Sequence, residues 1–189
     1  MRRVYLIRHG LTEGNRLRRY IGRTDETLCA AGRAALSAAP LKGIETVYVS
    51  PLLRARETAA ILFPHARQIV VDGLREMDFG AFENRSADDM KNDAAYRAWV
   101  DGLCEGDCPG GENRRGFVAR TVRAFEQICA AGGDAPLVIV AHGGTVMALM
   151  SELGEPKKDY WAWHVGAGGC LRCALDGGRL LYEGDGFDA

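Results

Sequence analysis

Two histidines that each follow an apolar run and precede glycine are the first sign of chemistry in this sequence. His9 lies in Arg8-His9-Gly10, directly after Val4–Ile7, and His142 lies in His142-Gly143-Gly144, directly after Leu137–Ala141. Arginine presents planar, forked donors that match phosphate oxygens, and glycine lets the backbone approach a bound group closely. A histidine between arginines keeps its ring neutral, because like charge disfavours the imidazolium form. These residues therefore predict a phosphate site with a histidine nucleophile.

The roles within this site follow from the residue types. Attack of His9 on phosphorus would give a phosphohistidine, a covalent intermediate that divides the reaction into two displacements. Cationic and hydrogen-bonding groups would stabilise the charge on the equatorial oxygens. The catalytic set that we expect is His9, Glu76, Arg8, Arg54 and His142, and the phosphate-binding set is Arg8, Asn15, Arg54, His142 and Gly143.

The leaving group needs a proton, and Glu76 is the predicted donor. It lies among Leu74, Met77 and Phe79, and partial burial would raise its pKa toward neutrality. In the second step the same carboxylate would activate water. The residue pattern leaves Glu13 and Asp78 open as alternative donors. Since the arginines supply positive charge, we expect neither a metal nor a cofactor.

Several further residues have two possible roles. Arg23 and Glu112 would either contact the substrate or pair on a surface loop, and both alternatives stay open. His164 stands beside Trp161 and Trp163, and we expect it to take part in packing rather than in catalysis. The tryptophans are expected in the core, with a pocket lid as the alternative.

The elements that must position these residues alternate along the chain. Short β-branched runs followed by amphipathic stretches are typical of a mainly parallel sheet with crossover helices. Strands are expected at about Arg3–Arg8, Thr46–Ser50, Gln68–Asp72, Leu137–Ala141, Cys170–Leu175 and Leu180–Glu183, the last two joined by a turn at Asp176-Gly177-Gly178. Helices are expected at about Ala30–Ala39, Leu52–Phe63, Ser86–Asp101, Arg114–Ala131 and Thr145–Leu153. Ser50-Pro51 is expected to cap the second helix, and Cys29 stands at the cap position of the first.

The predicted fold is an α/β three-layer sandwich, with a mainly parallel sheet flanked by helices and one domain over residues 1–189. In such sheets ligands bind beyond the carboxyl ends of the strands. Arg8-His9, Arg54, Glu76 and His142 all follow predicted strands, so we expect them at one edge of the sheet. Helix N-termini at that edge also favour anions.

Composition limits the partners and the compartment. The 24 basic and 25 acidic residues give a net charge of −1, which offers no broad field for nucleic acid or an anionic membrane. No apolar run approaches the roughly 20 residues of a membrane helix, and no signal peptide is apparent. The six cysteines are expected as free thiols in the cytoplasm. A zinc site is disfavoured because Cys170 and Cys173 would point to opposite faces of a strand.

The chain resembles the histidine phosphatases, which include the cofactor-dependent phosphoglycerate mutases. The resemblance covers nearly the whole chain, and its motifs fall in family order: Leu6–Gly10 with Thr12-Glu13 and Asn15, Gly22–Asp25, Gly32-Arg33, Ser50–Leu52 with Arg54-Ala55 and Glu57-Thr58, Leu74 with Glu76–Gly80, Gly110–Glu112, and Ala141–Gly144. It implies a phosphoglycerate mutase-like fold and His9 as phosphoryl acceptor. It also implies Arg8, Arg54, Asn15 and His142 as phosphate ligands and Glu76 as proton donor.

Within this family the chain looks most similar to the α-ribazole phosphatases of cobalamin assembly. The segments that carry this likeness are Glu76–Gly80, Tyr96–Trp99 and Trp161–Val165. The longer insertion of the mutases after Glu76 is missing, which implies hydrolysis of a small phosphomonoester rather than phosphoryl return. Gly14, Thr27 and Cys29 depart from the family pattern. A broad-specificity phosphatase, a mutase-type phosphotransferase and a non-catalytic phospho-ligand binding protein stay open as alternatives.

Overall fold

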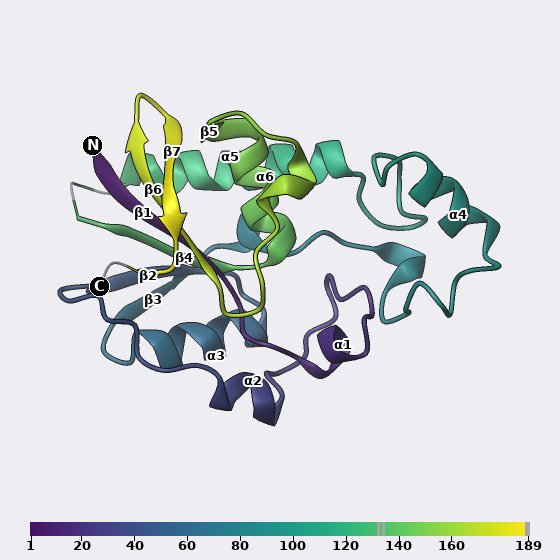
Figure 1. The fold of residues 1–189 in the computed structure, drawn as a ribbon, viewed down its shortest axis with the longest axis horizontal. Helices are drawn as coiled ribbons and strands as arrows, with labels where there is room; N and C mark the ends of the chain where they lie inside the picture. The colour runs from purple at the N-terminus through teal and green to yellow at the C-terminus, as the bar shows by residue number, and fades with distance from the viewer. Residues whose placement is uncertain (132, 134, 188–189) are drawn as a thin grey trace.

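The computed structural model describes residues 1–131, 133 and 135–187, and in this part of the chain seven strands form one sheet. Its order is β3-β2-β4-β1-β6-β7-β5 (Figure 1). The strands are β1 (Arg2–Arg8), β2 (Thr46–Val49), β3 (Arg67–Val70), β4 (Leu137–Ala141), β5 (Gly154–Glu155), β6 (Cys170–Asp176) and β7 (Arg179–Asp185). The pairs β3–β2, β2–β4 and β4–β1 are parallel, whereas β6 is antiparallel to both β1 and β7. The predicted mainly parallel sheet is confirmed.

Helices cover both faces of this sheet, as the three-layer prediction requires. They are α1 (Glu13–Arg16), α2 (Ala30–Ala34), α3 (Leu53–Leu62), α4 (Ala94–Asp101), α5 (Arg114–Ala131) and α6 (Gly143–Leu153). In β1, Val4 and Leu6 pack with α5 and α6, while Tyr5 and Ile7 pack with α3 on the opposite face. The two helical layers lie above and below the sheet in Figure 1. No helix in the described residues has both the length and the apolarity to cross a membrane.

Two predicted helices are shorter than expected because side chains or backbone groups offer competing hydrogen bonds. The helix predicted from Ser86 begins only at Ala94, where the Asp93 carboxylate accepts from the backbone N–H of Ala95 and Tyr96 as an N-cap. The helix predicted to run to Ala39 ends at Ala34, and the N–H of Ala39 instead donates to the carbonyl of Leu62. Local caps and tertiary pairing therefore overrode the amphipathic pattern.

The helix caps also differ from expectation. Helix α3 begins at Leu53 with Leu52 as its N-cap, so the predicted Ser50-Pro51 cap is wrong. The Ser50 hydroxyl lies 2.7 Å from a ring nitrogen of His142 instead. Cys29 does occupy the N-cap of α2, where its sulfur accepts from the N–H of Gly32 at 3.3 Å.

The C-terminal hairpin forms as predicted. Strand β6 ends at Asp176, β7 begins at Arg179, and both intervening glycines have positive φ, as a type I′ turn requires. Cys170 and Cys173 of β6 belong to the hydrophobic clusters on opposite faces of the sheet. All six cysteines lie in the described part of the chain, and each is a free thiol.

A smaller hydrophobic cluster lies beyond the carboxyl ends of the parallel strands. It joins α4 and the preceding loop to the start of α5 and includes Met77, Phe82, Trp99 and Phe117. Figure 1 shows α1 and α4 at this end of the molecule. These segments therefore lie beside the residues that follow β1, β2, β3 and β4. Since one sheet joins the two helical layers, we keep the prediction of a single domain.

Candidate active site

The two histidines predicted to form the site are neighbours because β1 and β4 pair in parallel. Arg8 is opposite Ala141 in the register, so the next residue on each strand is a histidine. The N–H of His9 donates to the carbonyl of Ala141 at 2.9 Å. The ring centroids of His9 and His142 are 5.2 Å apart, with an angle of 64° between the ring planes.

The His9 ring is held in one tautomer. Its Nδ1 lies 2.7 Å from the backbone oxygen of Gly10, and a carbonyl oxygen can only accept, so Nδ1 carries the proton. Nε2 therefore keeps a free lone pair. The side chain is buried, and burial together with the nearby charge of Arg54 lowers the pKa of His9 to about 3. The imidazole is neutral at physiological pH, the state in which a nucleophile can attack.

His142 is oriented by Ser50, a residue that the sequence did not identify as part of the site. The hydroxyl of Ser50 lies 2.7 Å from Nε2 of His142 and also accepts from the N–H of Leu52 at 3.4 Å. A hydroxyl can accept from Leu52 and donate to Nε2 at the same time, and in that arrangement the proton of the neutral His142 ring lies on Nδ1. That Nδ1 is buried without a hydrogen-bond partner among the described residues. Burial and then Arg54 hold the pKa of His142 well below its usual value, so the ring offers a neutral donor.

Ser50→Ala removes the hydroxyl beside Nε2 of His142, so the ring proton should no longer be held on Nδ1. We expect kcat/KM to fall about 10-fold, the effect of losing one buried hydrogen bond, and the inhibition constant of inorganic phosphate to rise in parallel. The same kinetics on Ser37→Ala, which removes an exposed hydroxyl, provide the matched control. Unchanged kcat/KM and phosphate inhibition in Ser50→Ala would exclude this role.

The two arginines come from different elements. Arg8, at the end of β1, donates through Nη1 to the carbonyl of Val165 at 2.7 Å. Arg54, in the first turn of α3, is fully buried and donates to the carbonyls of Thr24 and Gly22 at 2.7 and 2.8 Å. The Nε atoms of both arginines are buried without a partner in the described residues. A phosphate group would satisfy such donors, which folded proteins rarely leave unpaired.

Glu76 follows β3 through the short 3₁₀ turn η1 (Asp72–Leu74) and lies against the N-terminus of α6. Its carboxylate accepts from the N–H of Met77 at 2.9 Å and of Gly144 at 3.0 Å. Burial raises the pKa of Glu76, and these two hydrogen bonds, which lower it, offset that effect only in part. A Cβ atom at position 144 would come within 2.2 Å of the carboxylate, so a larger residue there would displace the Glu76 side chain.

The two alternative proton donors have other partners. Glu13 lies on the surface, where its carboxylate pairs with Arg16 at 2.9 Å. Asp78 pairs with Arg23 at 3.0 Å. Neither Glu13 nor Asp78 lines the pocket that contains Glu76. This geometry favours Glu76.

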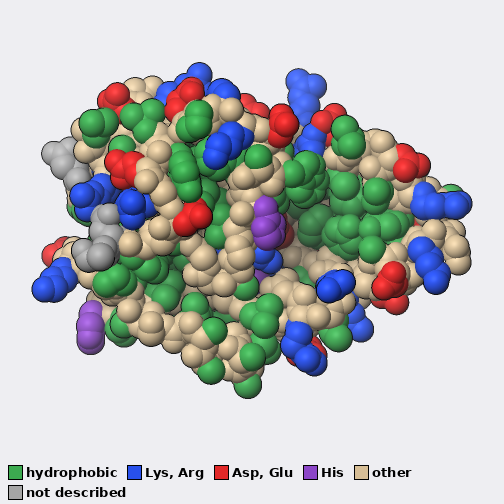
Figure 2. Space-filling model, in the orientation of Figure 1, with side chains coloured by type: hydrophobic (Ala, Val, Ile, Leu, Met, Phe, Trp, Pro, Cys, Tyr) green, Lys and Arg blue, Asp and Glu red, His purple; other side chains and the backbone are tan. Residues whose placement is uncertain are grey.

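A pocket of about 270 Å³ connects these groups with solvent. Its polar end is formed by Arg8, His9, Asn15, Glu76 and the two glycines that begin α6. The remaining wall is mostly apolar and aromatic, with residues Tyr20, Ile21, Met77, Phe79, Trp99, Met147, Tyr160 and Trp161. Figure 2 shows a hollow lined by hydrophobic side chains beside a histidine. Arg54 and His142 are fully buried behind this pocket rather than on its wall.

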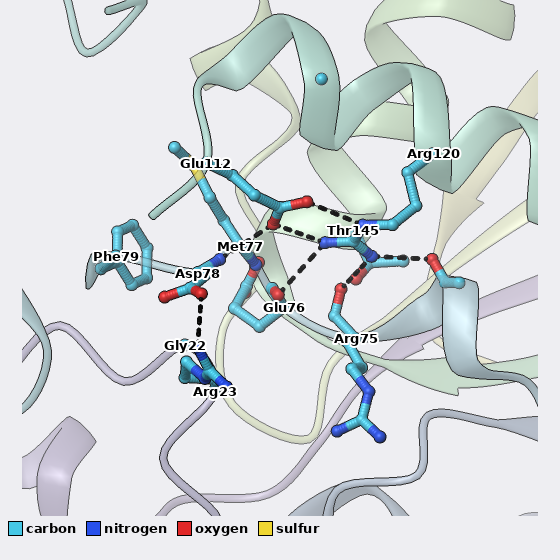
Figure 3. Close-up of polar contacts among 12 residues, drawn as sticks. Gly22, Arg23, Arg75, Glu76, Met77, Asp78, Phe79, Glu112, Arg120 and Thr145 are labelled. Carbon is cyan, nitrogen blue, oxygen red and sulfur yellow. Dashed lines mark hydrogen bonds and ion pairs between the residues drawn. The ribbon is translucent and has the colours of Figure 1, made fainter. Parts of the chain in front are cut away.

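Arg23 and Glu112 are not among the residues that line this pocket. Figure 3 shows the polar contacts that they make instead. Arg23 is exposed and pairs with Asp78. The carboxylate of Glu112 accepts from Arg120 at 2.7 Å and from the N–H of Asp78 at 3.0 Å. Their role in substrate binding stays a prediction, and the contacts favour a structural role for both.

Sequence reasoning missed part of the pocket rim. His164 is exposed rather than packed, and its Nε2 lies 3.3 Å from Nη1 of Arg8, so the expectation that it only packs is wrong. Arg114 lies over the ring of Tyr160, with its guanidinium carbon 5.2 Å from the ring centroid, and also lines the pocket. Trp161 is 53% exposed at the rim, whereas Trp99 and Trp163 are buried. The aromatic residues at 160–163 and the segment Tyr96–Trp99 were the sequence signals for this wall.

Several known proteins are similar to this chain in sequence or in fold. The family model of the histidine phosphatase superfamily (branch 1) matches residues 4–183. A Hydrogenobacter thermophilus protein provisionally named phosphoserine phosphatase 2 is 31% identical, over 96% of this chain and 95% of its own length. GpmB of Serratia proteamaculans, provisionally named a phosphoglycerate mutase, is 35% identical over 82% of this chain and 77% of its own length.

A solved structure shares the fold. The α-ribazole phosphatase from Shigella flexneri superimposes with a TM-score of 0.83 at 24% identity, covering 96% of this chain and 94% of that protein. The family match over nearly the whole sequence, together with the relatives above 30% identity, settles the assignment. The chain belongs to the histidine phosphatase superfamily, branch 1.

Proposed function

We propose that the protein hydrolyses phosphomonoesters through a phosphohistidine at His9. The observation that carries this proposal is the hydrogen bond from Nδ1 of His9 to the carbonyl of Gly10. It holds the proton of the neutral ring on Nδ1 and leaves the lone pair of Nε2 free. The Nε atoms of Arg8 and Arg54 support the proposal, because they are buried without a partner among the residues that the structure describes and can donate to phosphate oxygens.

The reaction takes two displacements. In the first, Nε2 of His9 bonds to phosphorus, the bond from phosphorus to the ester oxygen breaks, and Glu76 gives its proton to the leaving oxygen. In the second, water attacks phosphorus, its proton passes to the Glu76 carboxylate, and the P–N bond breaks to release phosphate. Arg8, Arg54, Asn15 and His142, with the N–H of Gly143, would hold the phosphoryl oxygens through both steps. The arginines provide the positive charge, so the scheme includes no metal and no cofactor.

The shape of the pocket favours a substrate with a bulky, flat organic group. Beyond the polar end, the wall is built mainly from aromatic and apolar side chains, and Glu76 is its only carboxylate in the described residues. A phosphoglycerate could pair its carboxylate with Arg19 or Arg114, which also line the pocket, but it is too small to fill the aromatic wall. We propose α-ribazole 5′-phosphate as the preferred substrate, because its benzimidazole base matches such a wall.

Two other functions remain to be tested against this proposal. A mutase-type phosphotransferase would return the phosphoryl group to an organic acceptor. The similarity to GpmB, which is provisionally named a mutase, is the reason to test this class. A binding protein without turnover would retain the phosphate ligands but would lack a working nucleophile or acid, and both residues are present in this chain. Measurement of phosphate release against isomer formation separates these classes.

A substrate panel tests the proposal. We expect kcat/KM for phosphate release from α-ribazole 5′-phosphate to exceed that from 3-phosphoglycerate about 100-fold or more, since each well-buried apolar contact is worth 10-fold or more. Nucleotides, sugar phosphates and p-nitrophenyl phosphate complete the panel, and a chelator control tests the absence of a metal.

A pocket variant makes this test specific. Trp161→Ala removes an exposed ring from the pocket rim and should raise KM for α-ribazole 5′-phosphate while leaving KM for glycerol phosphate unchanged. Isomer formation without phosphate release would contradict hydrolysis. Preference for 3-phosphoglycerate would contradict the proposed substrate only.

A further inference from the structure

Glu76 lies on a segment that no regular element holds. Residues 75–79 run between the 3₁₀ turns η1 (Asp72–Leu74) and η2 (Gly80–Phe82) without helix or strand pairing. Irregular segments are usually more mobile than the elements that they join. A general acid must nevertheless be held within hydrogen-bond distance of the oxygen that it protonates. Side chains from elsewhere in the fold must therefore fix this segment.

One guanidinium group on α5 holds the start of the segment and the 3₁₀ turn before it. Nη1 of Arg120 donates to the carbonyls of Gly73 and Arg75, each at 3.0 Å, and Nη2 donates to the carbonyl of Glu76 at 3.4 Å. Nε and Nη2 donate to the two carboxylate oxygens of Glu112 at 2.9 and 2.7 Å. These contacts account for all five N–H groups of an arginine side chain. Figure 3 shows Arg120 between the Glu76 segment and Glu112.

Glu112 holds the same segment on the other side of Glu76. Its carboxylate accepts from the N–H of Asp78 at 3.0 Å, and its backbone N–H donates to the carbonyl of Asp78 at 2.9 Å. Arg120 and Glu112 together therefore contact the backbone from residue 73 to residue 78. Both side chains are about three-tenths exposed, so the pair is only partly screened by water.

Arg120 is itself well fixed, and it lies apart from the substrate. It projects from the middle of α5, one turn after the fully buried Phe117, and its guanidinium carbon lies 5.1 Å from the centroid of that ring. Neither Arg120 nor Glu112 lines the pocket. Apart from a minor electrostatic effect of Arg120 on the pKa of His142, an effect of the pair on the reaction is expected to pass through the segment that carries Glu76.

We propose that Arg120 and Glu112 are positioning residues that hold Glu76 where it can protonate the leaving oxygen. This inference rests on the proposed phosphatase function and adds two residues to it. A planar fork that bridges three carbonyls and a carboxylate is a geometry that lysine, with a single ammonium group, cannot reproduce. The shape of the side chain, and not only its charge, should therefore matter for proton transfer.

The leaving-group dependence of kcat/KM distinguishes positioning of the acid from a general structural role. Arg120→Gln is expected to lower kcat/KM about 30-fold for an alkyl phosphate, whose leaving oxygen needs the proton, and less than about 3-fold for p-nitrophenyl phosphate. Arg123→Gln, which changes an exposed arginine on the same helix, should change neither value. A variant with a merely disturbed fold would lose activity toward both substrates equally.

Two further variants complete the experiment. Arg120→Lys keeps the charge and should still show the selective loss, whereas full rescue by lysine would overturn the positioning role. Glu112→Gln keeps an oxygen for the N–H of Asp78 but loses the ion pair, and it should show the same selectivity even if Arg120→Gln does not fold. Equal losses for both leaving groups in Arg120→Gln and Glu112→Gln would overturn this inference alone. Hydrolysis by the unaltered protein that does not depend on His9 would overturn the proposed function itself.

Discussion

His9→Ala is expected to lower kcat/KM for every phosphomonoester about 10⁴-fold or more, because no other group can form the covalent intermediate. The ring lies between the carbonyl of Gly10 and the His142 ring, and the backbone hydrogen bond from His9 to Ala141 does not involve the side chain. Binding of inorganic phosphate should weaken less than turnover, since Arg8 and Arg54 remain. Phosphate release and phosphate inhibition measure the two effects.

The control for this variant is another histidine. His65 is exposed in the loop after α3, and His65→Ala should leave turnover unchanged. Thermal unfolding of both variants checks that the fold is intact. Retention of full turnover by His9→Ala would exclude the covalent scheme and would leave direct attack of water on phosphorus as the alternative.

Glu76→Gln should have the second largest effect, and that effect should depend on the leaving group. For an alkyl phosphate we expect kcat/KM to fall about 10³-fold, within the range of general acid catalysis. For p-nitrophenyl phosphate the fall should be less than about 10-fold, because this leaving group departs without a proton. Water activation in the second step is also lost, so a burst of p-nitrophenol should precede a slow steady state.

The pH dependence of kcat/KM gives a second test of the role of Glu76. Glu76 must be protonated in the first step, and burial raises its pKa, so kcat/KM for an alkyl phosphate should fall as the pH rises through that raised value. His9, with its pKa of about 3, should contribute no loss of activity near pH 6.5. Glu13→Gln, on the surface, should keep the wild-type profile. A profile and leaving-group dependence unchanged in Glu76→Gln would assign the proton to another group.

The site could be predicted largely because it depends on strand ends. The two strands that end before His9 and His142 have clear apolar runs, and the prediction of β4 over Leu137–Ala141 agrees with the structure. Parallel pairing then brings residues that follow each strand to one edge of the sheet. The short motifs around Arg54 and Glu76 added two more positions at that edge.

Other features depend on tertiary contacts that no local pattern records. The sequence predicts Ser50 as a helix cap, but its hydroxyl orients His142 across the sheet edge. His164 reads as part of an aromatic core, but the turn at 160–163 exposes it beside Arg8. Arg120 belongs to an ordinary amphipathic helix, and only the folded chain shows that its guanidinium meets the backbone around Glu76.

The most direct test of the account is to trap the phosphoenzyme. Rapid mixing with a ³²P-labelled phosphomonoester, followed by an alkaline quench, should give a label that is stable in base, labile in acid and recovered in the peptide that contains His9. With labelled p-nitrophenyl phosphate, whose leaving group needs no proton from Glu76, the label should be stronger in Glu76→Gln, in which water activation is slow, and missing in His9→Ala. Turnover without any such label, or a label on a peptide other than that of His9, would contradict the central claim that this imidazole is the phosphoryl acceptor.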